Sequence, residues 1–132
     1  MIKFPKITKI DGGAAAVKSD ALSLGNYKNL GFLFENKDGA KLTVKLSASR
    51  EGGDASSTNF LLKAVDAAEF EQVEADGKII SDAGAFLAVV NDRILAHDEL
   101  DSVAVSIETD SGEVGTVYAI QLAPRYFVED NE

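Results

Sequence analysis

The 132-residue sequence contains no cysteine, no tryptophan and only two prolines. Without cysteine it can form neither a disulfide framework nor a thiolate metal site. It also lacks an apolar run of the ~20 residues that a membrane-spanning helix needs, and its first residues contain no uninterrupted signal-peptide segment. We therefore expect a single domain over residues 1–132, made and used in cytoplasm, that buries its core without covalent cross-links.

Positive charge is also scarce, because 13 Lys and Arg stand against 22 Asp and Glu, for a formal net charge of −9. Nucleic acids and anionic membranes are bound mainly through Lys and Arg, so we expect neither as a partner. The basic residues are concentrated near the start, at Lys3, Lys6, Lys9 and Lys18. This asymmetry indicates either an amino-terminal arm that contacts the acidic half of another copy, or simply a solvated surface.

Residues for catalysis are few. His97 is the only histidine, and its carboxylate neighbours Asp98 and Glu99 are typical of an exposed loop. No Gly-x-Ser-x-Gly elbow holds a nucleophile, and neither Gly12-Gly13 nor Gly52-Gly53 is followed by the Gly-Lys-Ser/Thr ending of a phosphate loop. The sequence therefore predicts no catalytic residue, no cofactor and no enzyme.

Metal and sugar sites lack their usual patterns. The alternating Asp spacing of a calcium loop is missing, and the best remaining acidic groups are Asp98, Glu99, Asp101, Asp110 and Glu113. We predict no metal site. Only Tyr27, Tyr118 and Tyr126 offer amphipathic rings, which is little for stacking on sugars or bases.

The clearest pattern is the alternation over residues 41–48, where Leu42, Val44, Leu46 and Ala48 share one face of a half-buried strand. A second apolar run, residues 30–34, precedes it. Asp-Gly between them supplies the positive-φ residue of a tight reversal, so the pattern predicts a β-hairpin over residues 29–48.

Other extended segments follow at intervals of roughly ten residues. Residues 2–10 are expected to form an edge strand or an extended arm, with 1–13 as the bounds of that arm, because Pro5 removes a ladder donor. Residues 85–90 are apolar on both faces and are expected to be central in a sheet. A helical turn is expected near 92–100, a hairpin turn at 110–113 and a frayed tail at 129–132. Further strands are expected at 14–17, 21–24, 60–65, 67–73, 78–81, 102–108, 114–122 and 124–128. Residues 67–73 could also form a short helix, but a strand is favoured because Phe70 and Val73 do not continue into a helical stripe.

These segments predict an all-β fold, an antiparallel and jelly-roll-like β-sandwich of about eight to ten short strands with at most one short helical turn.

Several stretches together resemble small virion proteins of tailed bacteriophages. They are residues 22–34 around Tyr-Lys, the Thr-Val-x-Leu-x-Ala-Ser strand within 41–53, the strand 103–107, and 117–126 with its Pro-Arg-Tyr tail. The resemblance covers most of residues 20–127. It implies a capsid decoration or cement protein on the exterior of the virion head, bound to the major capsid protein as a homo-oligomer, with a trimer favoured.

On this interpretation the contact with the shell or with another copy involves the two ends of the chain. The candidate interface residues are Lys3, Phe4, Lys6, Lys9, Arg125 and Tyr126. An edge strand packed on its own domain, and a tyrosine packed over a terminal strand, would explain the same residues without a partner.

Two other functions are left open by the sequence. A small sandwich is also typical of a carbohydrate-binding or adhesion module of a phage tail or fibre, although the missing tryptophans argue against it. A small glycoside hydrolase would need two carboxylates ~5–10 Å apart in a cleft, which 22 carboxylates neither exclude nor support.

Overall fold

The computed structural model describes residues 6–23, 27–37, 40–50, 54–91 and 102–124. Within these ranges the chain consists of strands and connecting turns, and contains no helix long and apolar enough to cross a membrane. The strands are β1 (Lys6–Ile10), β2 (Ala16–Lys18), β3 (Leu22–Ser23), β4 (Tyr27–Asn36), β5 (Leu42–Ser49), β6 (Ser56–Thr58), β7 (Phe60–Ala64), β8 (Glu71–Val73), β9 (Lys78–Ile80), β10 (Gly84–Asn91), β11 (Ser102–Thr109) and β12 (Val117–Pro124).

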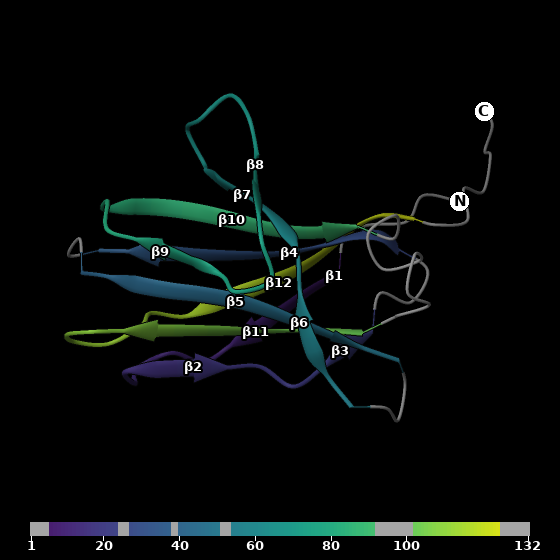
Figure 1. Cartoon of the computed structure of the whole chain (residues 1–132), viewed down its shortest axis with the longest axis horizontal. Helices are drawn as coiled ribbons and strands as arrows, with labels where there is room; N and C mark the ends of the chain where they lie inside the picture. The colour runs from purple at the N-terminus through teal and green to yellow at the C-terminus, as the bar shows by residue number, and fades with distance from the viewer. Residues whose placement is uncertain (1–5, 24–26, 38–39, 51–53, 92–101, 125–132) are drawn as a thin grey trace.

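The strands form two antiparallel sheets (Figure 1). Sheet I has the order β1-β12-β4-β10-β7-β8, and sheet II has the order β2-β11-β5-β6, with β3 also on β11 and β9 also on β5. The predicted all-β antiparallel sandwich is thus confirmed. The described residues hold more strands than the eight to ten expected, and five of the twelve have only two or three residues. The finer jelly-roll assignment stays a prediction, and the helical turn near 92–100 lies outside the described residues.

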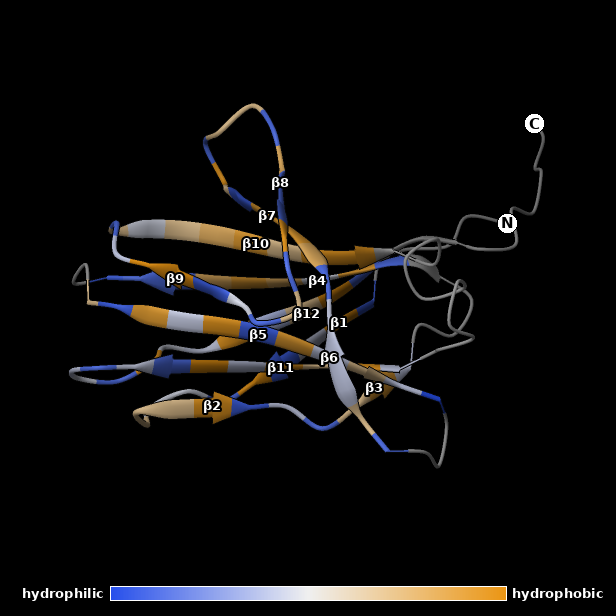
Figure 2. Ribbon diagram, in the orientation of Figure 1, coloured by the Kyte–Doolittle hydropathy of each residue, from blue (hydrophilic) through white to orange (hydrophobic). Residues whose placement is uncertain are grey.

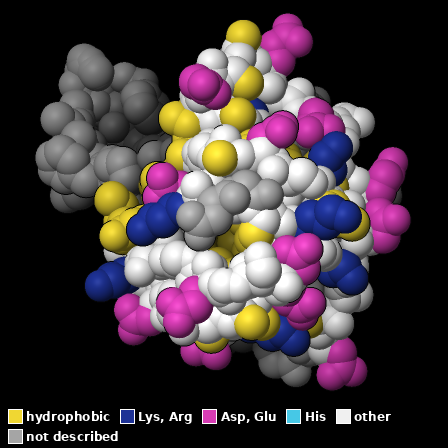
Figure 3. Space-filling model, turned by 90° about the vertical axis from the view of Figure 1, so that its left-hand side faces the viewer, with side chains coloured by type: hydrophobic (Ala, Val, Ile, Leu, Met, Phe, Trp, Pro, Cys, Tyr) yellow, Lys and Arg dark blue, Asp and Glu magenta, His cyan; other side chains and the backbone are white. Residues whose placement is uncertain are grey.

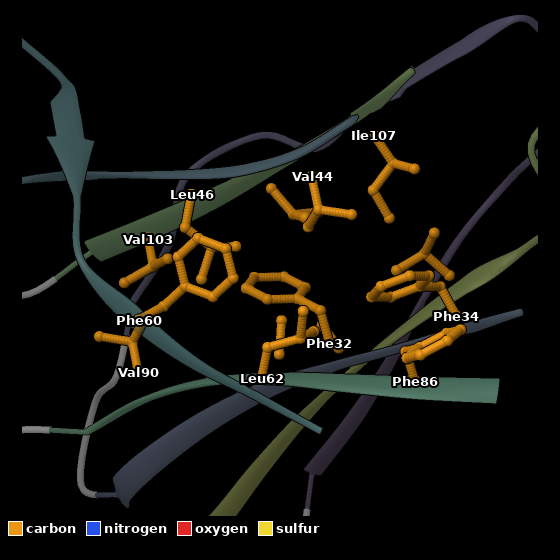
Figure 4. Packing of buried hydrophobic residues seen from close by; sticks show 14 of the residues in the cluster. Phe32, Phe34, Val44, Leu46, Phe60, Leu62, Phe86, Val90, Val103 and Ile107 are labelled. Atoms are coloured by element: carbon orange, nitrogen blue, oxygen red, sulfur yellow. The ribbon is translucent and has the colours of Figure 1, made fainter. Parts of the chain in front are cut away.

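The core lies between the sheets and follows from period-two alternation. Phe32 of β4 and Phe60 of β7 project from sheet I toward Val44, Leu46 and Val103 of sheet II, and each of these side chains is at most 1% exposed (Figure 4). At one end the rings of Phe34 and Phe86, which are cross-strand partners, stack with their centroids 5.9 Å apart. The inward residues predicted for 41–48 and 103–107 are buried as expected.

The predicted hairpin over residues 29–48 is wrong. Strand β4 pairs with β10 and β12 in sheet I, whereas β5 pairs with β11, β6 and β9 in sheet II. The two strands therefore face each other across the core instead of lying side by side. The physical reason is that β10 and β12 occupy the two hydrogen-bonding edges of β4, so no edge is left for β5. Asp38 and Gly39 lie outside the described residues.

The hairpin predicted at residues 110–113 is also wrong, because β11 belongs to sheet II and β12 to sheet I. Gly112 does have the positive φ of 77° that a turn favours, and so does Gly77, at 93°, where the chain passes from β8 in sheet I to β9 in sheet II. These glycine turns carry the chain from one sheet to the other. In contrast, β5 and β6 pair with each other in sheet II, and β7 and β8 pair with each other in sheet I. In Figure 1 the loop between β7 and β8 projects away from the body.

The β1–β2 connection also crosses from sheet I to sheet II, and it touches the β11–β12 crossing at one end of the sandwich. The amide of Gly13 donates to the carbonyl of Val114 at 2.8 Å, and the amide of Val114 donates to the carbonyl of Ala14 at 2.8 Å. Gly12 packs directly on the backbone of Gly115, where a Cβ atom would have no room. A residue without a side chain is therefore required at position 12 for the β1–β2 and β11–β12 crossings to meet.

Candidate interaction surfaces

The outward side of sheet I is unusually apolar for a surface. On β4 the inward residues are Leu30, Phe32 and Phe34, so Leu33 points outward. The same alternation on the strands beside it directs further apolar side chains outward. We call this surface the apolar outer face, and its residues are Ile7, Gly31, Leu33, Leu61, Leu87, Val89, Tyr118 and Ile120.

Strand register arranges the apolar outer face in two rows across the sheet. The first row is apolar over five strands, in the order Ile7, Ile120, Gly31, Val89 and Leu61, and ends at Gln72 on β8. The second row has three apolar residues between two lysines, in the order Lys9, Tyr118, Leu33, Leu87 and Lys63. Cross-strand neighbours on one face are close enough to pack against each other, so the rows form one continuous surface.

Gly31 lies in the middle of this surface and explains its smoothness. A Cβ atom there would meet Leu87 Cδ1 at 3.2 Å and Val89 Cγ2 at 3.5 Å, so both side chains lie over the glycine. Leu33, Leu87 and Val89 are half-buried as a result, while Ile7 is 63% exposed and Tyr118 is 40% exposed. The face is closed at its centre and open toward β1.

The outward side of sheet II is different. Strands β5 and β11 turn Thr43, Lys45, Ser47, Ser106 and Glu108 outward. Figure 2 shows the contrast, with β10 hydrophobic along most of its length and β5 alternating between the two colours. One sheet thus has the polar exterior expected of a solvated sandwich, and the other does not.

Charges are sparse on the apolar outer face. Among the side chains that the structure describes on this side, Lys9 and Lys63 lie at the two ends of the second row and Glu35 lies beyond it. Lys63 Nζ lies 5.5 Å from the centroid of the Phe70 ring, and Lys9 Nζ lies 3.9 Å from an Asp11 carboxylate oxygen. On a chain of net charge −9 this side is therefore locally poor in negative charge.

Of the candidate interface residues from the sequence, Lys6 and Lys9 lie exposed on β1. This strand is at the edge of sheet I and pairs with β12. Lys3, Phe4, Arg125 and Tyr126 lie outside the described residues, and so do His97, Asp98, Glu99 and Asp101. Asp110 accepts a hydrogen bond from the amide of Lys41 at 3.1 Å.

Sequence reasoning missed most of the apolar outer face. The available signal was the run of residues 30–34 and 85–90, which are apolar at consecutive positions instead of alternate ones. That signal correctly predicted a central position for β10, between β4 and β7. It did not show that the second apolar side would face outward.

A hollow of about 640 Å³ opens at the end of the sandwich where the crossings meet. Asn36, which is 3% exposed, donates its side-chain amide there to the carbonyl oxygens of Ala40 at 2.7 Å and Asp82 at 3.2 Å. Lysines and carboxylates are interspersed around this end (Figure 3). No group of three or more metal-ligating side chains occurs among the residues searched, which are those that the structure describes. The geometry here positions turns and does not converge on a reacting atom.

Comparison with known proteins identifies a likeness of fold. No protein-family model matches the chain, and no curated protein sequence matches it. A crystal structure of the SPBc2 prophage-derived protein YomS is similar, with a TM-score of 0.58 and 16% sequence identity, covering 92% of this chain and 96% of that chain. The two proteins share a fold over nearly their whole lengths.

Proposed function

We propose that this chain is a non-enzymatic structural protein of a phage particle, a capsid decoration or cement protein that stabilises the head from outside. The observation that carries the proposal is the shared fold with a prophage-derived protein over 92% of this chain. The resemblance of residues 20–127 to small virion proteins of tailed phages points the same way.

The surfaces of the molecule suit a binding role. The described part of the chain offers two broad sheet surfaces and an exposed edge strand, and the hollow at the end of the sandwich is lined largely by turn residues. Among the described strands, β1 pairs with β12 at the edge of sheet I, and it presents Lys6 and Lys9 on a chain of net charge −9. An edge strand offers backbone donors and acceptors to a partner, and lysines favour an acidic one.

The proposed partners are the major capsid protein of the shell, contacted through the β1 edge, and other copies of this chain. Each copy would contact neighbouring capsid subunits and add buried area between them. Symmetry repeats that contribution over the whole shell, so a modest contact per copy raises the resistance of the head to internal pressure.

The test is co-sedimentation of purified protein with heads of the encoding phage that lack it. We expect the unmodified protein to bind. The double variant Lys6→Glu/Lys9→Glu should bind at least about tenfold more weakly, because charge reversal at an interface opposes association. The matched control is Lys18→Glu/Lys45→Glu, which makes the same charge change on the outward side of sheet II, where both lysines neighbour Ser106.

Equal loss of binding in the two double variants would show a general charge effect and would contradict an interface at β1. Failure of the unmodified protein to sediment with heads would reject the decoration role. Specific binding to glycans in its place would support an adhesion module.

A further inference from the structure

We propose that the apolar outer face of sheet I binds the same face of a second copy, to form a two-fold symmetric dimer. The proposal begins with the contrast between the two sheets. Both have inward apolar residues, but only sheet I also has two consecutive rows of apolar side chains on its outward side. An exposed apolar surface of this extent on a monomer marks an interaction site.

The whole outward side of sheet I is large enough for a stable dimer. Six strands spaced ~4.8 Å apart are about 24 Å wide, and the eight-residue register between β4 and β10 is about 27 Å long. Their product is about 650 Å² per copy, or about 1,300 Å² in total, which lies within the range of about 1,200–2,000 Å² for specific interfaces. The two rows of the apolar outer face cover about half of that length, or about 330 Å² per copy. They form the apolar centre of the contact, and the flanking positions, which include Glu35 and Gln72, form its polar rim.

The distribution of charge favours a second copy as the occupant. Two chains of net charge −9 repel each other, but charges separated by more than ~8 Å are largely screened at physiological salt. The apolar outer face lacks carboxylates in both of its rows, so two copies that meet there bring no acidic side chains of these rows into contact. Lys9 and Lys63 lie at the ends of the second row, where they stay solvated at the rim.

The shape of the face favours a self-complementary contact. Its centre is smooth because Leu87 and Val89 lie over Gly31, and two twisted sheets of this kind pack face to face about 10 Å apart. A contact in which both copies use the same surface is two-fold symmetric and closes after two copies. The geometry thus points to a dimer, whereas the resemblance to phage proteins favoured a trimer.

The experiment is light scattering on the whole chain across a concentration series. We expect a mass of twice 14.0 kDa at concentrations of ~10 µM and above. Leu87→Lys at the centre of the face, and Tyr118→Lys at a position already 40% exposed, should each weaken dimerisation by about 30-fold or more, because a lysine would be buried without a partner. The control Ile79→Lys, at a position 61% exposed on a strand of sheet II, should leave the dimer unchanged.

A second measurement locates the interface without relying on weakened binding. The chain has no cysteine, so Leu87→Cys and Ile79→Cys each introduce a single thiol. A short bismaleimide should cross-link two copies of the Leu87→Cys variant at low protein concentration and leave the Ile79→Cys variant monomeric.

The proposal would be overturned by a monomer at ~100 µM or by a trimer. It would also be overturned by a dimer that neither lysine variant weakens and that cross-links equally at positions 87 and 79. These results are independent of binding to phage heads, so a failure of the decoration role and a failure of this interface can be told apart. The circular dichroism spectrum of Tyr118→Lys, whose side chain is exposed in the monomer, shows whether the fold is retained.

Discussion

Replacement of Gly12 by alanine tests the contact between the two sheet crossings. A Cβ atom built at Gly12 lies 2.5 Å from the carbonyl oxygen of Val114 and overlaps the carbonyl group of Gly115. All of these atoms are backbone, so no side-chain rotation relieves the overlap. The two crossings must therefore separate by about 1 Å to restore an ordinary contact of about 3.5 Å.

The expected loss of stability follows from the interactions that this separation would break. The two 2.8 Å hydrogen bonds between Gly13, Ala14 and Val114 would stretch beyond useful length, at about 0.5–1.5 kcal/mol each. Val114 is 2% exposed, and partial loss of its packing adds about 1 kcal/mol. The total is about 2–4 kcal/mol, and the entropy of unfolding expected for 132 residues converts it to a fall of about 7–14 °C in Tm.

The assay is thermal unfolding followed by far-UV circular dichroism, with urea unfolding as a second measure. Gly115→Ala is the matched control, because a Cβ atom there has no other atom within 4 Å, and its Tm should change by only a few degrees at most. If Gly12→Ala melts within 2 °C of the unmodified chain, or if the two variants melt alike, the close approach of the crossings is refuted.

Three further predictions concern the turns and the core. Gly77→Ala should destabilise the fold more than Gly13→Ala, because both positions have positive φ but a Cβ at Gly77 also lies 2.6 Å from the carbonyl oxygen of Val44; equal urea midpoints would contradict this. Phe32→Ala should lower the free energy of unfolding by about 3–5 kcal/mol, because the ring is 0% exposed; a loss under about 1 kcal/mol in urea unfolding would show that the core is wrongly assigned. Asn36→Asp should destabilise most at neutral pH, because a carboxylate cannot donate to the two carbonyl partners. Burial should raise the pKa of the new carboxyl in the folded state, so the stability deficit relative to the unmodified chain should shrink as the pH falls toward 4, and a deficit independent of pH would argue against burial.

The sequence predicted the faces of the strands far better than their neighbours. Alternation fixes which side chains point inward, and Leu42, Val44 and Leu46 are buried as that rule requires. Alternation does not determine which strands exchange hydrogen bonds. A glycine turn with positive φ, such as the one at Gly112, serves a hairpin within one sheet and a crossing between two sheets equally well. The hairpins predicted over 29–48 and at 110–113 were both wrong for lack of this information about pairing.

The same limit applies to the candidate interaction surfaces. The sequence predicted an edge strand with Lys6 and Lys9, and the structure places both on β1 at the edge of sheet I; their role at an interface stays a prediction. The apolar outer face was not predicted, because Ile7, Leu33 and Leu87 are brought together only by the order of strands in sheet I. A strand that is apolar on both sides indicates that both faces of its sheet are apolar. The order of the strands and the position of the other sheet determine whether another part of the same chain packs on each face.

The position of β12 between β1 and β4 has a consequence for biosynthesis. While the ribosome is still translating the middle of the chain, β1 has no hydrogen-bonding neighbour in sheet I and β4 has one free edge. The nascent polypeptide must therefore hold its first strands unpaired until the segment 117–124 emerges from the exit tunnel. We therefore expect sheet I to close only after residues 117–124 have been synthesised, because β12 is the strand that joins β1 to β4.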